Sequence, residues 1–196
     1  KGWISVIDPA NVLFMLWAAP FFQGKVMDVC AAPGGKSLMI AELGKVDSLY
    51  LNDVSRHRIK RIQENIRRTD ISPSAILQSD GVKLPFDKHY FDTVLIDAPC
   101  SSTGTIQKNP DIKWTASEET LLKHLELQRQ LLDEGARILK PGGTLIYSTC
   151  SLEMEENQNQ IEAFLARHTG FFMKKRPSDS AFFQLDDWTN EDNSFF

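Results

Sequence analysis

Two cysteines with chemically active neighbours follow apolar runs in the second half of the chain. Cys100 comes directly after "TVLIDAP" and Cys150 directly after "TLIYST". Such runs are typical of buried strands, and the carboxyl ends of parallel strands lie at one edge of a sheet. Asp97 precedes the first cysteine, and Lys36 lies in a Gly-rich turn at the end of an earlier strand. A nearby cation lowers the pKa of a thiol and makes it a nucleophile, so these four residues are candidate catalytic groups.

A thiolate beside a carboxyl group suits methyl transfer to carbon 5 of cytosine. That carbon is too weak a nucleophile to take a methyl group directly, but addition of a thiolate to carbon 6 makes it enamine-like. A carboxyl group that hydrogen-bonds or protonates ring nitrogen 3 favours this addition. An enzyme that methylates an amino group would need no cysteine. It would be expected to carry an Asp/Asn-Pro-Pro-aromatic motif at the strand end, where this sequence has Asp-Ala-Pro-Cys. The residues alone leave open which cysteine attacks, and a lone strand-end cysteine is more often an inert core residue.

The Gly-rich turn "DVCAAPGGKS" ends in Gly-Lys-Ser, as a phosphate-binding P-loop does. The P-loop pattern G-x-x-x-x-G-K-[ST] requires glycine at position 30, which is Cys30 here, and Pro33 removes an amide donor. A nucleotide triphosphatase is therefore disfavoured. A tight Gly-rich turn after a strand also lets the backbone approach an adenosine-bearing cofactor, and this second use is the one we expect.

Acidic residues end the next two expected strands. Asp53 in "YLND" stands where an acid grips ribose hydroxyls, although it also suits the N-cap of the following helix. Asp80 in "SDG" could reach an adenine amino group, although it also suits a turn. These acids fit S-adenosylmethionine and a dinucleotide equally well.

The order of expected elements predicts an α/β fold with a mostly parallel sheet flanked by helices. The hydrophobic pattern predicts five strands, with a turn at Pro141 to Gly143 just before the fifth. The segment "GFFMKK" is expected to form a further strand after the last helix. "NSFF" at the end is a candidate edge strand. We expect strands over 25–31, 47–53, 74–80, 91–99 and 144–150, and helices over 36–44, 55–68, 117–140 and 154–168.

Composition narrows the class of protein further. The length of 196 residues suits one domain, and no run approaches the roughly 18 apolar residues of a membrane span. Three separated cysteines without a C-x-x-C pair predict neither a disulfide framework nor a zinc site, and favour a cytoplasmic setting. The net charge of −4 is mild evidence against a nucleic-acid-binding protein. Residues 56–68 are expected to form a basic helix, but such a helix is more often simply a solvent-exposed face than a binding site. The start at Lys1 suggests a fragment.

Three motifs together closely resemble one family. "DVCAAPGGKS", "DAPCSSTGTIQKNPDIKW" and "YSTCSLEMEENQ" are similar to those of RNA (cytosine-5) methyltransferases of the RsmB/Nop/Sun type, above all the bacterial 16S rRNA enzymes. The resemblance runs from "ISVIDPA" to "EAFLARH". It implies a Rossmann-like class I fold that uses S-adenosylmethionine, with all of residues 1–196 in the catalytic domain and an N-terminal RNA-binding region missing.

The resemblance also implies residue roles. Cys150 would be the nucleophile and Cys100 would help to release the product, whereas DNA cytosine-5 methyltransferases attack with the cysteine of Pro-Cys. Asp97 would lie between cofactor and target base, with Lys36 at the catalytic edge. Asp53 would hold the ribose of the cofactor and Asp80 would lie near its adenine. The methionine side of the cofactor would be held by Cys30, Ala31, Ala32, Pro33, Gly34, Gly35 and Lys36.

The implied partner is RNA, with ribosomal RNA favoured over transfer RNA. The target cytosine must be single-stranded or flipped out to reach such a pocket. Ser102 stands where the family commonly has glycine, and this small residue should do little harm. Two alternatives remain: a class I methyltransferase for another substrate, with both cysteines structural, and an RNA-assembly factor without turnover. No metal and no membrane are expected.

Overall fold

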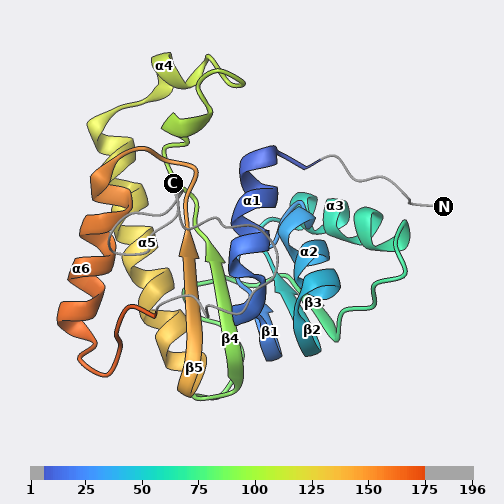
Figure 1. Ribbon diagram of the computed structural model, residues 1–196. Helices are drawn as coiled ribbons and strands as arrows, with labels where there is room; N and C mark the ends of the chain where they lie inside the picture. Colours follow the sequence, from blue (N-terminus) through green and yellow to red (C-terminus); the bar gives the residue numbers. More distant parts are fainter. Residues whose placement is uncertain (1–6, 175–196) are drawn as a thin grey trace.

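The chain folds around a five-stranded sheet in which every strand pairs in parallel with its neighbours. The computed structural model describes residues 7–174, and within them the strand order is β3-β2-β1-β4-β5 (Figure 1). The order reverses between β1 and β4, which is where open α/β sheets bind ligands. The parallel α/β sheet expected from the sequence is confirmed. The strands are β1 (Gln23–Asp28), β2 (Lys45–Asn52), β3 (Ala75–Leu77), β4 (Phe91–Asp97) and β5 (Leu139–Ser148).

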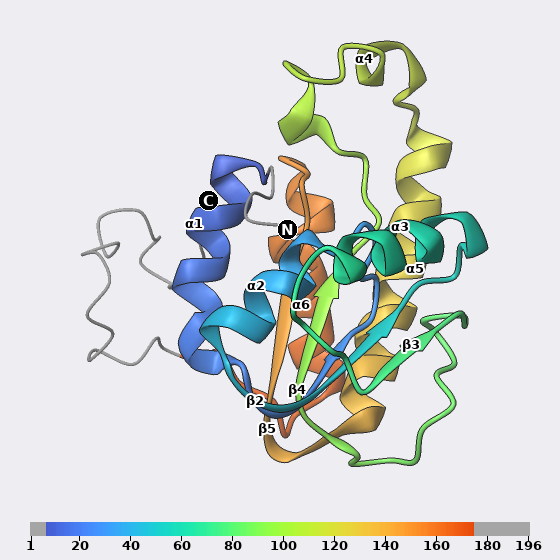
Figure 2. The ribbon, with the colours of Figure 1, turned by 90° about the vertical axis from the view of Figure 1, so that its right-hand side faces the viewer.

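Helices cover both faces of the sheet. α1, α2 and α3 lie on one face, and α5 and α6 lie on the other (Figures 1 and 2). The short α4 lies beyond the carboxyl ends of β4 and β5. The helices are α1 (Pro9–Ala18), α2 (Gly35–Leu43), α3 (Arg56–Arg67), α4 (Ile112–Thr115), α5 (Glu118–Ile138) and α6 (Gln158–Arg167), with 3-10 turns η1 (Ala19–Phe21), η2 (Thr103–Thr105) and η3 (Met154–Glu156).

The interior strand β4 shows why the sheet needs cover on both sides. Leu95 packs into the core beneath α1 to α3, whereas Val94 and Ile96 pack into the core beneath α5 and α6. All three side chains are fully buried. Burying each aliphatic side chain of this size contributes roughly 1.5–3 kcal/mol, so the two cores hold the strand firmly between its neighbours β1 and β5.

Polar side chains cap several helices where the sequence changes from loop to helical periodicity. The Ser55 hydroxyl accepts from the Arg58 amide at 3.4 Å at the start of α3, and Ser117 accepts from the Thr120 amide at 3.2 Å at the start of α5. Helix α3 buries Ile59 and turns its basic side chains outward. Its basic character is thus mainly that of a solvated face.

Two expectations about strands are wrong. Strand β5 begins at Leu139 and runs through Pro141, where a turn was expected. Proline is tolerated because β5 is the edge strand among the described residues, and the register against β4 shifts between Phe91 and Thr93. No strand forms over 171–174; the Phe171 ring instead packs against the α6 ring of Phe164, with centroids 5.0 Å apart. Residue 175 and the "NSFF" segment lie outside the described residues.

Candidate active site

The two candidate nucleophiles meet at the carboxyl edge of the sheet. Cys100 follows β4 and Cys150 follows β5, and their sulfur atoms are 3.2 Å apart. The Cys150 amide also donates to the Cys100 sulfur at 3.3 Å. Parallel pairing of β4 with β5 places the two strand ends side by side, because Asp97 is in register with Ser148. The structure therefore brings together the cysteine pair predicted from sequence.

Asp97 and Lys36 form an ion pair at the same edge. The Lys36 Nζ lies 2.7 Å from Asp97 Oδ2, and the Ser148 hydroxyl donates to Asp97 Oδ1 at 2.9 Å. Lys36 stands in the first turn of α2, which follows β1, and it reaches across to the end of β4. These contacts fix the carboxylate, so all four predicted catalytic residues lie at one edge of the sheet. Ser148 was not anticipated, although it stands next to the Thr-Cys motif.

The surroundings make the two thiols unequal. A hydrogen bond from Cys100 lowers the pKa of the Cys150 thiol, Ser102 adds to this effect, and partial burial opposes it. The same contact with Cys150, together with burial, raises the pKa of Cys100. Cys150 is also the more exposed of the pair. The pKa of Cys150 is therefore the lower of the two, which suits Cys150 better than Cys100 as a nucleophile.

The loops after β4 and β5 are joined by backbone hydrogen bonds. The Gly104 amide donates to the Cys150 carbonyl at 3.0 Å, and the Leu152 amide donates to Thr103 Oγ1 at 2.9 Å. A Cβ atom on Gly104 would lie 2.9 Å from the Cys150 carbonyl oxygen, closer than packing allows. Glycine at this position therefore permits the close approach that holds Cys150 in place.

The buried carboxylate of Glu156 stabilises the loops that follow β4 and β5. Glu156 is fully buried and accepts from the Ser101 amide at 2.9 Å, from the Ser101 hydroxyl and from Gln128 Nε2 at 3.0 Å. Burial alone would raise the pKa of Glu156, but hydrogen bonds from Ser101, Ser151 and Gln128 outweigh it and hold the pKa below its ordinary value. Sequence analysis missed this residue. Its one signal was an acid shortly after the Thr-Cys motif.

Hydrogen bonds to Asn52, the last residue of β2, fix the Gly-rich turn that follows β1. The Ala31 amide donates to the Asn52 carbonyl at 2.8 Å, and the buried Asn52 side chain donates to the Val29 carbonyl at 3.0 Å. Gly34 has φ +104°, a conformation that glycine adopts readily, and it is the N-cap residue of α2. Asn52 is a second residue that the sequence did not single out. It fixes the turn that was predicted to face a cofactor.

Within this turn, Cys30 differs from the other two cysteines. Burial, reinforced by the negative charge of Asp28, raises the pKa of its thiol. The residue packs at the edge of the core beneath α5 and α6. Cys30 can therefore shape the turn through its backbone, but its thiol is not a nucleophile at neutral pH.

Two buried acids beside the turn each keep one oxygen without a protein partner among the described residues. Asp53 Oδ1 accepts from the Ser55 amide at 2.9 Å and pairs with Arg58 at 3.0 Å, while its Oδ2 has no partner. Asp28 Oδ2 accepts from the Ser37 hydroxyl at 2.6 Å, while its Oδ1 has none. Such oxygens fit a ligand that carries hydroxyl or amino donors, because an unsatisfied buried acceptor is costly.

Asp80 is placed differently from Asp28 and Asp53. Its side chain is exposed, and its carboxylate accepts from the Val82 amide at 3.1 Å, as in an Asx turn. The loop that carries it is fixed to β2, because the neighbouring Ser79 hydroxyl donates to the Asn52 side chain at 2.7 Å. Asp80 thus acts locally as a turn residue next to the Gly-rich turn.

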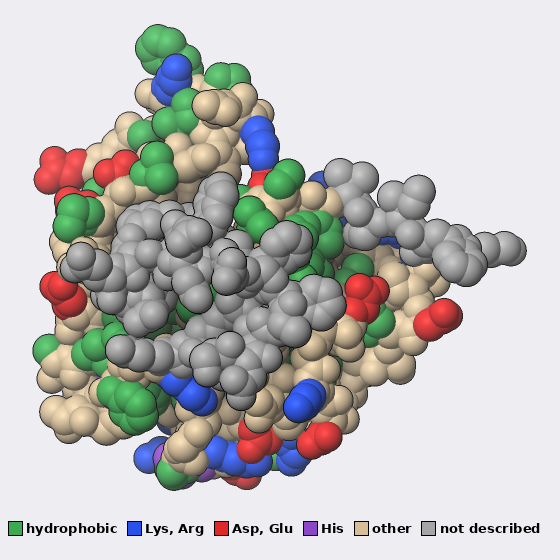
Figure 3. All heavy atoms as spheres, in the orientation of Figure 1, with side chains coloured by type: hydrophobic (Ala, Val, Ile, Leu, Met, Phe, Trp, Pro, Cys, Tyr) green, Lys and Arg blue, Asp and Glu red, His purple; other side chains and the backbone are tan. Residues whose placement is uncertain are grey.

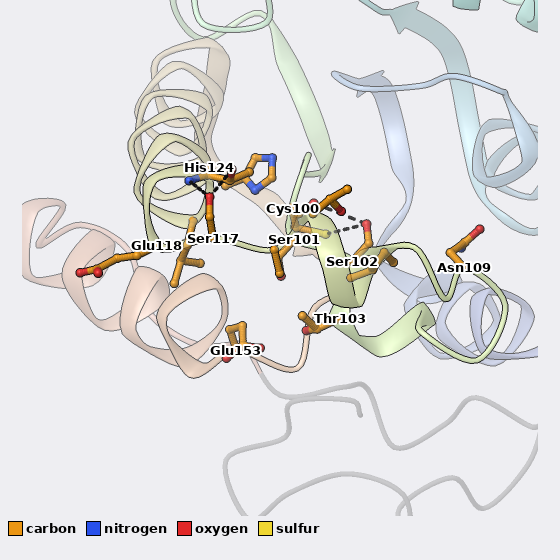
Figure 4. Close-up of a pocket in the computed structure, with 14 residues that line it drawn as sticks. Cys100, Ser101, Ser102, Thr103, Asn109, Ser117, Glu118, His124 and Glu153 are labelled. Atoms are coloured by element: carbon orange, nitrogen blue, oxygen red, sulfur yellow. Dashed lines mark hydrogen bonds between the residues drawn. The ribbon is translucent and has the colours of Figure 1, made fainter.

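A cavity of about 610 Å³ opens beside Cys100. The loop from Cys100 to Thr103 forms one wall, and His124 and Ser117 of the α5 region form another (Figure 4). The residues of the Gly-rich turn do not line it. The cavity is therefore lined by the loop that begins at Cys100 and by residues of the α5 region, and not by the Gly-rich turn.

Residues 7–174 contain neither a membrane-spanning helix nor a cluster of metal ligands. No helix there is long and apolar enough to cross a membrane. No group of three or more His, Cys, Asp and Glu side chains in that range is arranged to hold a metal ion.

Comparison with known proteins decides the family. The family model described as "16S rRNA methyltransferase RsmB/F" matches residues 15–185. The chain belongs to this family. It is 39% identical over 170 residues to ribosomal RNA small subunit methyltransferase B of Vibrio cholerae, and 41% identical over 171 residues to the protein of that name from Sodalis glossinidius. The alignments cover 85% and 86% of this chain but 39% of each relative, so the RsmB/F chain described here spans about two-fifths of their length.

Solved structures agree with this assignment. The crystal structure of PH0851 superposes with a TM-score of 0.80 at 40% identity, covering 85% of this chain and 38% of the other. NSun6 from Pyrococcus horikoshii with SFG gives a TM-score of 0.77 at 27% identity, covering 90% of this chain and 45% of the other. These matches confirm the Rossmann-like class I methyltransferase fold and the resemblance seen in the motifs. They also indicate S-adenosylmethionine as the cofactor of this RsmB/F domain.

Proposed function

We propose that this RsmB/F chain is the catalytic domain of an RNA methyltransferase that forms 5-methylcytosine in small-subunit ribosomal RNA. The observation that carries the proposal is the pair of sulfur atoms 3.2 Å apart, beside the ion-paired Asp97, with the pKa of Cys150 lowered by its contact with Cys100. Methyl transfer to an amino group or a ribose would use none of these cysteines. The relatives' names support ribosomal RNA as the substrate.

The cofactor would be held at the Gly-rich turn and the acids beside it. The backbone from Cys30 to Lys36 would face its methionine end, and Asp53 would accept from its ribose hydroxyls through the buried oxygen that lacks a protein partner. Asp80 would lie near the adenine, and Asp97 would separate cofactor from base. When bound, S-adenosylmethionine supplies the methyl group.

In the proposed reaction, the Cys150 thiolate adds to carbon 6 of the cytosine, and the electron pair of the 5,6 double bond moves to carbon 5. Asp97 favours the addition as a carboxylic acid that donates its proton to ring nitrogen 3, an acceptor in cytosine, and Lys36 and Ser148 orient its carboxyl group. Once carbon 5 carries the methyl group, a water molecule acting as base takes the proton from carbon 5, the electron pair of that C–H bond forms the 5,6 double bond, and the pair of the bond between carbon 6 and sulfur returns to Cys150. This restores the double bond and the Cys150 thiolate, and Cys100 assists this release from its place beside the sulfur.

RNA binding would depend in part on regions outside this chain. On the face that Figure 3 shows, Lys and Arg side chains gather along the lower edge, at the opposite end from α4, with acidic side chains among them. Phosphate contacts supply much of the affinity for nucleic acid, and the net charge of −4 supplies little of it. We propose that, in a protein as long as the relatives, the parts outside this chain make most of these phosphate contacts.

Covalent trapping tests the proposed function. A relative-length protein carrying Cys100→Ser is incubated with S-adenosylmethionine and 16S rRNA transcribed without modifications, then denatured and separated by size. We expect a protein–RNA adduct that disappears in Cys100→Ser/Cys150→Ser and persists in Cys30→Ser/Cys100→Ser. Sequencing the trapped RNA identifies the cytosine. An adduct that survives loss of Cys150 would assign the attack elsewhere. Absence of any adduct would contradict the two-cysteine mechanism and favour the other-substrate interpretation.

A further inference from the structure

We propose that the basic face of α3 binds backbone phosphates of the RNA strand that carries the target cytosine, a role that rests on the proposed function, in which the substrate is RNA. Residues 56–68 hold six basic side chains and one acidic side chain, a net charge of +5, in a chain whose net charge is −4. The rest of the chain therefore carries −9, and positive charge is concentrated on this helix. The basic face consists of the exposed cations Arg56, Lys60, Arg61, Arg67 and Arg68.

The protein leaves this charge without counter-charges of its own. Arg58, at the margin of the helix, pairs with Asp53 at 3.0 Å, but no ion pair within residues 7–174 involves a member of the basic face. A helix that is merely solvated gains from charges of opposite sign four residues apart. Here Arg56 and Lys60 are four residues apart with the same sign, which is unfavourable in the free protein.

The charge also opposes the dipole of the helix. The first turn of α3 contains no acidic residue, and it holds Arg56 and Arg58. Because the N-terminal end of a helix carries a partial positive charge, cations are disfavoured there. The helix thus adds to the positive potential of the face, and a polyanion that replaces water on the face relieves both the repulsion between like charges and the unfavourable dipole interaction.

Contacts with the Gly-rich turn place the basic face at the edge of the sheet that holds the site. The Asn65 side chain donates to the Pro33 carbonyl at 2.7 Å, and the Arg68 guanidinium donates to Asn65 Oδ1 at 2.6 Å. The same turn leads into Lys36, which pairs with Asp97. Figures 1 and 2 show α3 at the end of the sheet toward which β4 and β5 point. The basic face therefore lies at the edge that an RNA substrate must approach.

The chemistry of the face suits phosphates rather than bases. It consists of four arginines and one lysine, and guanidinium groups bind phosphate oxygens through two parallel hydrogen bonds. Residues 56–68 include no Phe, Tyr or Trp on which a base would stack. Such a face positions a strand without reading its sequence. Since the rest of the chain is negative, it repels the same strand, and the charge distribution favours one orientation of the RNA.

The salt dependence of RNA binding tests the proposal. In a relative-length protein, Lys60→Gln/Arg61→Gln removes two charges from the basic face. The matched control, Lys45→Gln/Lys88→Gln, removes two exposed charges at the opposite edge, where β2 and β4 begin. Affinity for unmodified 16S rRNA transcript is measured by filter binding over a range of KCl concentrations.

Each contact to a single-stranded phosphate contributes about 0.7 to the slope of log affinity against log salt concentration. In Lys60→Gln/Arg61→Gln the slope should therefore become shallower by about 1.4, and binding at about 0.1 M salt should weaken roughly 25-fold. The control variant should match wild type in both quantities, because its lysines lie away from the proposed path of the strand.

An unchanged slope in Lys60→Gln/Arg61→Gln would overturn the proposal. An equal change in both variants would do the same, because net charge and not this face would then be the cause. A lower melting temperature with an unchanged slope would assign the face to the rest of the longer protein. Covalent trapping is a separate outcome: a shallower slope without any RNA adduct leaves phosphate binding by α3 standing and removes cytosine-5 methylation, and an adduct with an unchanged slope does the reverse.

Discussion

Cys100 and Cys150 come from different strands, yet their sulfur atoms lie 3.2 Å apart, and the backbone amide of Cys150 points at the sulfur of Cys100. The β4–β5 register and the hydrogen bond from Gly104 to the Cys150 carbonyl hold this arrangement. The proximity that suits two-cysteine catalysis also exposes the pair to oxidation, because a thiolate beside a second thiol readily forms a disulfide.

Diamide should therefore link Cys100 to Cys150 within one chain. The two thiols give up two protons and two electrons, and the azo group of diamide is reduced to a hydrazine. Of the three free cysteines, we expect Cys30 alone to remain a thiol, labelled by a thiol reagent after the protein is denatured, and dithiothreitol to restore the other two. Peptide mapping measures the linkage. Linked dimers, or all three thiols still free, would contradict the observed geometry.

The buried Glu156 carboxylate should be a large contributor to stability. Glu156→Gln replaces an acceptor with an amide whose NH₂ group faces the donors of Ser101 and Gln128. We expect a loss of about 2–4 kcal/mol in the free energy of unfolding at neutral pH, measured by denaturant titration. The matched control is Glu155→Gln at an exposed position next to it, which should change little.

The effect of Glu156 should also depend on pH. Its folded pKa is below the unfolded value, so the carboxylate stabilises the fold above the unfolded pKa and loses this effect as pH falls through the folded pKa. The difference between wild type and Glu156→Gln should therefore shrink in acid. A difference that stays constant down to acid unfolding would mean that the charge of Glu156 does not matter.

Asp28 should show the opposite pH dependence. Burial raises its pKa from 3.8 to about 7, so between these values the unfolded chain ionises while the folded chain keeps the proton. The free energy of unfolding should then fall with rising pH, at most by about 1.4 kcal/mol per pH unit in that window.

Asp28→Asn isolates this effect, because the amide oxygen can still accept from the Ser37 hydroxyl. The variant should gain stability relative to wild type as pH rises from about 4 to about 7, in unfolding titrations at several pH values. A variant that is uniformly less stable across the window would show that Asp28 is ionised in the folded state.

Local patterns in the sequence determined the order of elements and the edge of the sheet where chemistry takes place. Apolar runs ending in Asp97 and Cys150 predicted strands that need cover on both faces, and the Gly-rich turn predicted where a cofactor would approach. These features depend on residues close together in the chain, and the motifs around them were specific enough to indicate the family. The expectations for Pro141 and for residues 171–174 failed because edge position and packing against α6 override local propensity.

Only the tertiary structure decided how the groups at that edge affect one another. The residues that support the site, Asn52 and Glu156, act through contacts with strands and loops far away in sequence, and their types alone carry no signal of this. The same holds for the two thiols: the sequence placed both at strand ends, but their sulfur atoms come within 3.2 Å of each other only once β4 and β5 pair, and this contact lowers the pKa of Cys150. A pKa depends on burial and on neighbours in space, and the chain acquires both only by folding.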